Sequence, residues 1–166
     1  MSATPVAVGT HRELVAIPSN QHDDWIIHQA IVLLERRIFK AGPTLLGPVD
    51  VRDYLRLKLA SEFNEIFAAV FLDTQFQVLA YEPLFQGTVD EAAVYPRVVV
   101  QRALAINAAA VLFAHNHPSG GTTPSEADRL ITKRLKAALA TVDVRVLDHF
   151  IVGKGEPFSL AEAGLM

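Results

Sequence analysis

Residues 110–117 read Ala-Val-Leu-Phe-Ala-His-Asn-His, an apolar run that ends in two histidines. The run is short and rich in apolar residues, which favours a buried strand. Side chains alternate along a strand, so the rings of His115 and His117 should point to the same side of a sheet. A polar loop over 118–124 follows, and Ser125 is placed to cap a new helix. The strand end is therefore the first candidate for a functional site.

Outward from this stretch, apolar runs alternate with helical periods. Apolar runs predict strands over residues 66–72, 76–81, 84–89, 109–114 and 144–152. Apolar residues at helical spacing predict helices from Asp23 to the Gly42-Pro43 stop and over residues 50–59, 96–107 and 125–140. Strands interleaved with helices indicate an α/β (α+β) fold with a mixed β-sheet flanked by helices.

The composition excludes several classes of protein. Of the 166 residues, 51% are hydrophobic and 20% are charged, which excludes a disordered chain. The absence of cysteine excludes disulfides, thiolate metal sites and the zinc deaminases of nucleobases. The net charge of -3 provides no strong field toward nucleic acid or an acidic membrane. The first ten residues lack a signal-peptide pattern and no apolar stretch approaches a membrane span, so we expect a cytoplasmic protein without a membrane partner.

Asp128 completes a candidate set of metal ligands. It lies in the first turn of the helix that follows the loop, so the chain can return a carboxylate toward His115 and His117. Two imidazoles and one carboxylate suit Zn²⁺ and leave the fourth tetrahedral position for water, as in catalytic zinc sites. The Ser-x-x-Asp sequence also has a simpler interpretation, in which Ser125 is the helix N-cap and Asp128 complements the helix dipole.

Residues 115–128 fit H-x-H-x7-S-x2-D, the pattern of JAB1/MPN-type (JAMM) metalloproteases. More narrowly, the chain resembles the RadC family of bacterial proteins over about residues 45–166. The segments that carry this resemblance are His115-Asn-His-Pro-Ser-Gly, Phe71-Leu-Asp73, Leu84-Phe-Gln-Gly-Thr88 and Val146-Leu-Asp-His149.

The RadC resemblance implies a JAB1/MPN-like, cytidine-deaminase-like sandwich and one Zn²⁺ per chain. We expect a flexible arm over residues 1–22, a helical segment over 23–60 and an MPN/JAMM-like catalytic domain over 61–166. The helix-hairpin-helix module of longer relatives is absent from the sequence, so we expect the short form.

The same resemblance assigns catalytic roles. Ser125 would donate a hydrogen bond to the oxyanion of the tetrahedral intermediate. A glutamate just before the first apolar strand would act as general base, and Glu62 and Glu65 are both candidates. In RadC-like sequences the acid immediately precedes that strand, which selects Glu65. Glu62 remains the alternative, with a simpler interpretation as a solvated carboxylate at a helix end.

The predicted function is zinc-dependent hydrolysis of an amide bond, peptide or isopeptide, in a peptide or protein substrate. The alternative is a nucleic-acid- or protein-binding module of the RadC type, associated with DNA repair. Its support is a basic helix face, Arg129, Lys133 and Lys136, but the net charge of -3 predicts weak or indirect binding to nucleic acid. A metal-dependent nuclease is a third hypothesis, which lacks a second cluster of ligands. The sequence leaves open whether the chain forms a homodimer.

Three further residues near these motifs have predicted structural roles. Asn116 lies between the two histidines, so its side chain should face the opposite side of the strand. Asp148 and His149 lie inside an apolar strand. They could support a metal ligand, but the sequence favours a structural hydrogen bond for the pair.

Overall fold

A computed structural model describes residues 25–30, 42–59, 62–87 and 94–166. The chain divides into two compact units, Met1–Phe39 and Lys40–Met166. In the first unit residues 25–30 are helical, in agreement with the helix predicted from Asp23. The rest of that helix and the predicted arm over residues 1–22 lie outside the described residues. No helix in the described ranges is long and apolar enough to cross a membrane.

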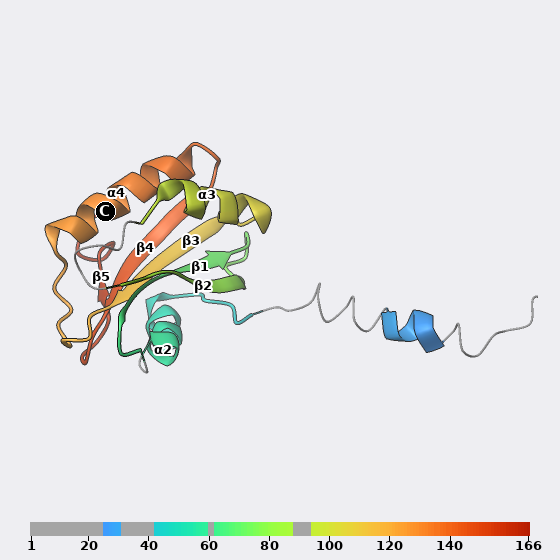
Figure 1. Cartoon of the computed structure of the whole chain (residues 1–166), viewed down its shortest axis with the longest axis horizontal. Helices are drawn as coiled ribbons and strands as arrows, with labels where there is room; N and C mark the ends of the chain where they lie inside the picture. The colour runs from blue at the N-terminus through green and yellow to red at the C-terminus, as the bar shows by residue number, and fades with distance from the viewer. Residues whose placement is uncertain (1–24, 31–41, 60–61, 88–93) are drawn as a thin grey trace, which may run out of the picture. The chain divides into compact units, whose positions relative to one another are not determined.

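A mixed sheet forms the centre of the second unit (Figure 1). Five strands make it in the described part of the chain: β1 (Glu65–Leu72), β2 (Val78–Gly87), β3 (Ala110–Asn116), β4 (Arg145–Val152) and β5 (Phe158–Ser159). Their order is β2-β1-β3-β4-β5. β3 and β4 are parallel, and the other neighbouring pairs are antiparallel. The predicted mixed sheet is therefore confirmed.

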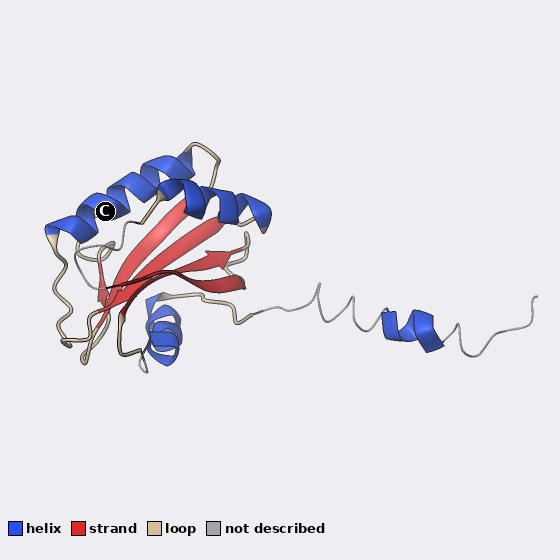
Figure 2. Ribbon diagram, viewed as in Figure 1, coloured by secondary structure: helices blue, strands red, loops and turns tan. Residues whose placement is uncertain are grey.

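Helices cover both faces of this sheet (Figure 2). α2 (Pro48–Leu59) lies on one face, and α3 (Pro96–Ala105) and α4 (Glu126–Ala140) lie on the other. Leu112 of β3 belongs to the core beneath α2, whereas Val111 and Phe113 belong to the core beneath α3 and α4. A central strand buried on both faces is expected to be apolar throughout, as residues 110–114 are. The predicted helices and mixed sheet thus form a three-layer sandwich.

α2 is part of the same compact unit as the sheet. Its side chains Val51, Leu55 and Leu59 are buried in the core on that face. The predicted grouping of residues 23–60 as one helical segment stays a prediction, because residues 31–41 and 60–61 lie outside the described residues.

The edge strand β2 corrects one feature predicted from the sequence. The strands predicted over 76–81 and 84–89 form a single strand as far as Gly87, where the described part of this segment ends. Its pairing with β1 shifts at Leu84, which is an extra residue in the ladder. Pro83 is tolerated because β2 is an edge strand, and a bulge absorbs the extra residue. The short β5 was not predicted.

The connection from β3 through α4 to β4 determines where the functional motif lies. β3 continues two residues beyond its predicted end, to Asn116, and α4 returns the chain to the parallel neighbour β4. β1 is antiparallel to β3, with Phe67 beside His115, so the first residue of β1 reaches the last residues of β3. The start of β1, the ends of β3 and β4 and the start of α4 therefore meet at one end of the strands.

Candidate metal centre

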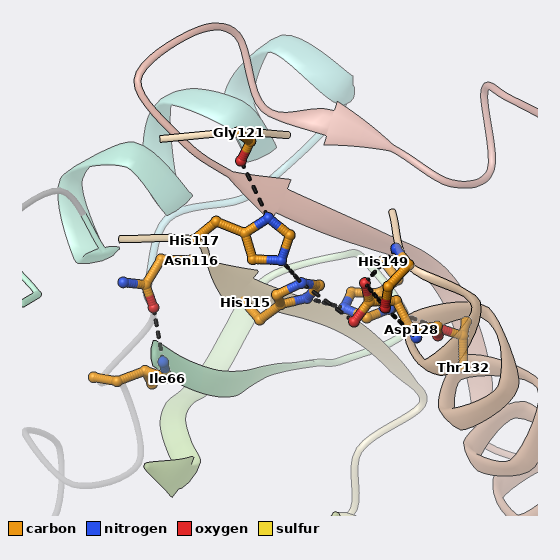
Figure 3. A network of polar contacts seen from close by, with 9 residues as sticks. Ile66, His115, Asn116, His117, Gly121, Asp128, Thr132 and His149 are labelled. Carbon is orange, nitrogen blue, oxygen red and sulfur yellow. Dashed lines mark hydrogen bonds and ion pairs between the residues drawn. The ribbon is translucent and has the colours of Figure 1, made fainter. Parts of the chain in front are cut away.

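The predicted site residues come together at this end of the sheet from three segments of the chain, and Figure 3 shows His115, His117 and Asp128 among them. His115 lies on β3, Asp128 lies in the first turn of α4, and Glu65 is the first residue of β1. His117 directly follows β3, and its N–H donates to the carbonyl of Val152 on β4. Glu65, His115 and His117 each place one ligand atom within 4.8 Å of the others.

His115 is the central residue of the cluster. Its side chain is buried, and its Nε2 lies 2.9 Å from Nε2 of His117 and 3.3 Å from Oδ1 of Asp128. Burial lowers the pKa of His115 to about 4, so its ring is neutral at neutral pH. Two nitrogen ligands bound tetrahedrally to zinc at 2.0–2.1 Å would lie about 3.3 Å apart. The distance from His115 to Asp128 equals that separation, and the distance between the two histidine nitrogens is shorter than it.

The hydrogen bond on the far side of His117 determines which of its ring nitrogens is bare. Nδ1 lies 3.2 Å from the carbonyl oxygen of Gly121, and a carbonyl can only accept. Nδ1 of a neutral His117 therefore carries the proton, and the bare Nε2 faces His115. Such an orientation by an outer hydrogen bond is usual for histidines that bind a metal.

Asp128 takes part in a helix cap and in the cluster at the same time. Its Oδ2 accepts from the backbone N–H of Ser125 at 2.7 Å and from the Ser125 hydroxyl at 2.6 Å. The Ser125 Oγ in turn accepts from the Asp128 N–H at 3.1 Å, which completes a capping box. The simpler interpretation of Ser125 and Asp128 is thus correct for local structure. The cap also holds Oδ1 of Asp128 toward His115. Burial alone would raise the pKa of Asp128, but the interaction with His115 and the hydrogen bonds from Ser125 lower it by more, so the pKa is below its usual value.

The chemistry of these atoms fits a zinc ion. Nε2 of His117 and Oδ1 of Asp128 are both hydrogen-bond acceptors, and they lie on either side of Nε2 of His115. Acceptor atoms this close repel one another unless a proton or a cation lies between them. Two imidazole nitrogens and one carboxylate oxygen are a usual donor set for zinc.

Glu65 and Glu62 differ in their position relative to the cluster. Glu65 lies beside both histidines and on the wall of the adjoining cleft. Burial, opposed by His117 and assisted by Asp128, raises the pKa of Glu65 above its usual value. Glu62 contributes its backbone carbonyl to a hydrogen bond with Asn116. The geometry thus favours Glu65 of the two candidates.

Asn116 faces away from the histidines, as predicted. Its Oδ1 accepts from the N–H of Ile66 at 2.8 Å, and its Nδ2 donates to the carbonyl of Asn64 at 2.9 Å. A longer bond of 3.4 Å reaches the carbonyl of Glu62. The side chain thereby joins the end of β3 to the residues on either side of Glu65.

The structure separates the roles of Asp148 and His149. Asp148 has the predicted structural role, because it accepts from the N–H of His149, the hydroxyl of Ser159 and the N–H of Ala161. His149 instead contacts a site residue, with its Nε2 2.8 Å from Nδ1 of His115. Burial lowers the pKa of His149 to about 3, so its ring is neutral.

Thr132 is a site residue that the sequence analysis missed. Its Oγ1 lies 2.6 Å from Nδ1 of His149 and 2.6 Å from the carbonyl oxygen of Asp128. Its position four residues after Asp128, on the same face of α4, was the signal that could have indicated it.

An open cleft of about 840 Å³ leads to the cluster. The four converging side chains and Ser125 lie along its wall, together with one cation, Arg134. The rest of the wall is largely apolar, from Phe63, Phe85, Val94, Tyr95, Leu130 and Ile131. An apolar cleft with a few convergent polar groups is typical of a ligand-binding site.

The sandwich and the convergent histidines define a JAB/MPN-type domain. The chain belongs to the RadC family, because the model of the RadC-like JAB domain matches residues 45–165. The resemblance identified from the sequence is therefore confirmed.

Three similar proteins are each named UPF0758 protein. One from Azotobacter vinelandii is 57% identical over 140 residues, which cover 82% of this chain and 62% of the relative. One from Stutzerimonas stutzeri is 56% identical over 142 residues, with 83% and 63% covered. One from Methylibium petroleiphilum is 60% identical over 124 residues, with 75% and 56% covered. The matched part of the chain thus spans about three fifths of the length of these relatives.

Proposed function

We propose that this protein is a zinc-dependent hydrolase of amide bonds, peptide or isopeptide, in peptide or protein substrates. The observation that carries the proposal is the cluster of Glu65, His115 and His117 at a cleft, whose ligand atoms lie within 4.8 Å of one another, with Oδ1 of Asp128 3.3 Å from Nε2 of His115. His115, His117 and Asp128 would hold one zinc ion per chain. When bound, zinc would polarise the amide carbonyl and make water more acidic. A cytoplasmic location is part of the same proposal.

Glu65 is the proposed general base. It would take a proton from the attacking water as the new C–O bond forms, and it would deliver that proton to the amine as the C–N bond breaks. Burial raises the pKa of Glu65, which brings this carboxylate closer to the pH at which it must both accept and release a proton.

Ser125 is the proposed donor to the oxyanion. Its side chain lines the cleft, although its hydroxyl proton is donated to Oδ2 of Asp128 in this structure. When the hydroxyl turns to the substrate, Asp128 still accepts from the Ser125 N–H. A donor to an oxyanion lowers the barrier by about 2.7–4 kcal/mol in other hydrolases.

The apolar wall of the cleft supports a peptide substrate. Phe63, Tyr95 and Leu130 are exposed although they are large and apolar. Exposed apolar side chains beside polar groups usually mark a binding surface. They would contact apolar side chains near the cleaved bond.

The test compares Glu65→Gln with Glu62→Gln. Glutamine keeps the size of glutamate but cannot accept a proton at neutral pH. We expect Glu65→Gln to keep the zinc content and thermal stability of the wild type while hydrolysis falls about 10²–10⁴-fold. Glu62→Gln should leave the zinc content, the thermal stability and the rate of hydrolysis unchanged. The assays are elemental analysis of protein purified without chelators, and cleavage of a quenched fluorescent library of peptides and isopeptides.

Asp128→Asn separates a ligand from a base in the same assays. It should lower the zinc content, because it removes the charge of a ligand. If Glu62→Gln abolished hydrolysis while Glu65→Gln did not, Glu62 would be the base. Loss of zinc in Glu65→Gln would make Glu65 a ligand, and full zinc content in the double variant His115→Ala, His117→Ala would overturn the metal site.

A further inference from the structure

A line of hydrogen bonds runs behind His115 into the protein interior (Figure 3). Nδ1 of His115 lies 2.8 Å from Nε2 of His149, and Nδ1 of His149 lies 2.6 Å from the Thr132 Oγ1. The same Oγ1 lies 2.6 Å from the carbonyl oxygen of Asp128. The three residues are each at most 1% exposed, so water does not compete for these hydrogen bonds.

The carbonyl at the end of this line determines the direction of every hydrogen bond in it. A carbonyl oxygen only accepts, so the hydroxyl of Thr132 must donate its one proton to Asp128. The Thr132 Oγ1 can then only accept, which requires a proton on Nδ1 of His149. A neutral His149 with that proton has a bare Nε2, which must accept from Nδ1–H of His115. Nε2 of His115 is therefore left bare, facing His117 and Asp128.

An opposing interaction makes this direction consequential. Oδ1 of Asp128 lies 3.3 Å from Nε2 of His115 and the bare Nε2 of His117 lies 2.9 Å from it, and both acceptors favour a proton on that nitrogen. A His115 protonated on Nε2 could not offer that atom to a metal. The line from the Asp128 carbonyl holds the proton on Nδ1 instead, against the attraction of the carboxylate of the same residue.

We propose that Thr132 and His149 are positioning residues that hold His115 in the Nδ1–H tautomer and keep its Nε2 available as a metal ligand. The role of Nε2 of His115 as a metal ligand rests on the proposed zinc-dependent function. The tautomer itself is a property of the metal-free protein, so it is measured independently of zinc and of hydrolysis.

The test uses the whole metal-free chain labelled with ¹⁵N-histidine. Nitrogen NMR distinguishes a ring N–H from a bare ring nitrogen, and His115→Gln assigns the His115 signals. We expect wild-type His115 to carry its proton on Nδ1. Thr132→Val keeps the shape of the side chain but lacks the hydroxyl, and it should populate the Nε2–H tautomer. Its affinity for Zn²⁺ alone, measured by chelator competition, should fall about 10–100-fold.

Two matched variants separate positioning from a general effect on α4. Thr132→Ser keeps the hydroxyl and should retain both the tautomer and the zinc affinity of the wild type. Thr141→Val removes a similar bond, from the Thr141 hydroxyl to the carbonyl of Ala138 at 2.6 Å, at the other end of α4. It should leave both readouts unchanged.

An Nε2–H tautomer in wild-type His115 would overturn the inference, as would an unchanged tautomer and zinc affinity in Thr132→Val. If Thr132→Val does not fold, the wild-type and Thr132→Ser spectra still decide the tautomer. If His115 is in the Nδ1–H tautomer but the wild type binds no zinc, the proposed zinc function fails while the positioning by Thr132 and His149 stands.

Discussion

Asn116→Ala should lower the free energy of unfolding by about 2–4 kcal/mol. The side chain is 4% exposed and makes two short hydrogen bonds, with the Ile66 N–H and the Asn64 carbonyl. Losing the bond to the Asn64 carbonyl costs about 0.5–1.5 kcal/mol, and leaving the buried N–H of Ile66 unpaired costs about 1–3 kcal/mol. Because these bonds hold the start of β1, zinc binding and the position of Glu65 should be affected as well.

Urea unfolding followed by far-UV circular dichroism measures this loss. Asn64→Ala is the matched control, because Asn64 is exposed and contributes only its backbone carbonyl to the bond with Asn116. It should change the stability by no more than about 0.5 kcal/mol. An Asn116→Ala variant as stable as the control would refute the reasoning.

Two further predictions concern the histidines and the loop after β3. Burial lowers the pKa of His149 from 6.5 to about 3. Between these pH values His149 is protonated in the unfolded chain but neutral in the folded, metal-free protein. The free energy of unfolding should therefore be highest above pH 6.5 and fall toward pH 3, and His115, whose pKa burial lowers to about 4, adds to the same fall. Urea titrations across this range should show a weaker dependence for His149→Gln, and an equal slope would contradict the assignment. Gly153→Ala would place a Cβ 2.5 Å from the carbonyl oxygen of Gly120, which should cost about 1–3 kcal/mol and weaken zinc binding. Gly155→Ala, whose Cβ would meet nothing within 4 Å, should be neutral in thermal unfolding, and equal melting temperatures for the two variants would refute this account.

The sequence predicted the elements that depend on neighbouring residues. Apolar runs, helix periods and the Ser125 cap are local patterns, and most of those in residues 42–59, 62–87 and 94–166 recur close to their predicted bounds. The prediction failed at Pro83, where it divided one strand into two. Whether a proline interrupts a strand depends on whether that strand lies at an edge, and strand order is a long-range property.

The sequence alone also determined the ligand candidates, because His115, His117 and Asp128 lie within one short motif. It could not determine which distant residues support them. Asn116 meets Ile66 across 50 residues of sequence, and His115 meets His149 across 34. Pairing of β3 with β1 and β4 brings those residues together, and no local pattern records that pairing. The proton positions on His115 and His149 follow from it, because the folded interior excludes water and gives each ring nitrogen of His149 one hydrogen-bond partner.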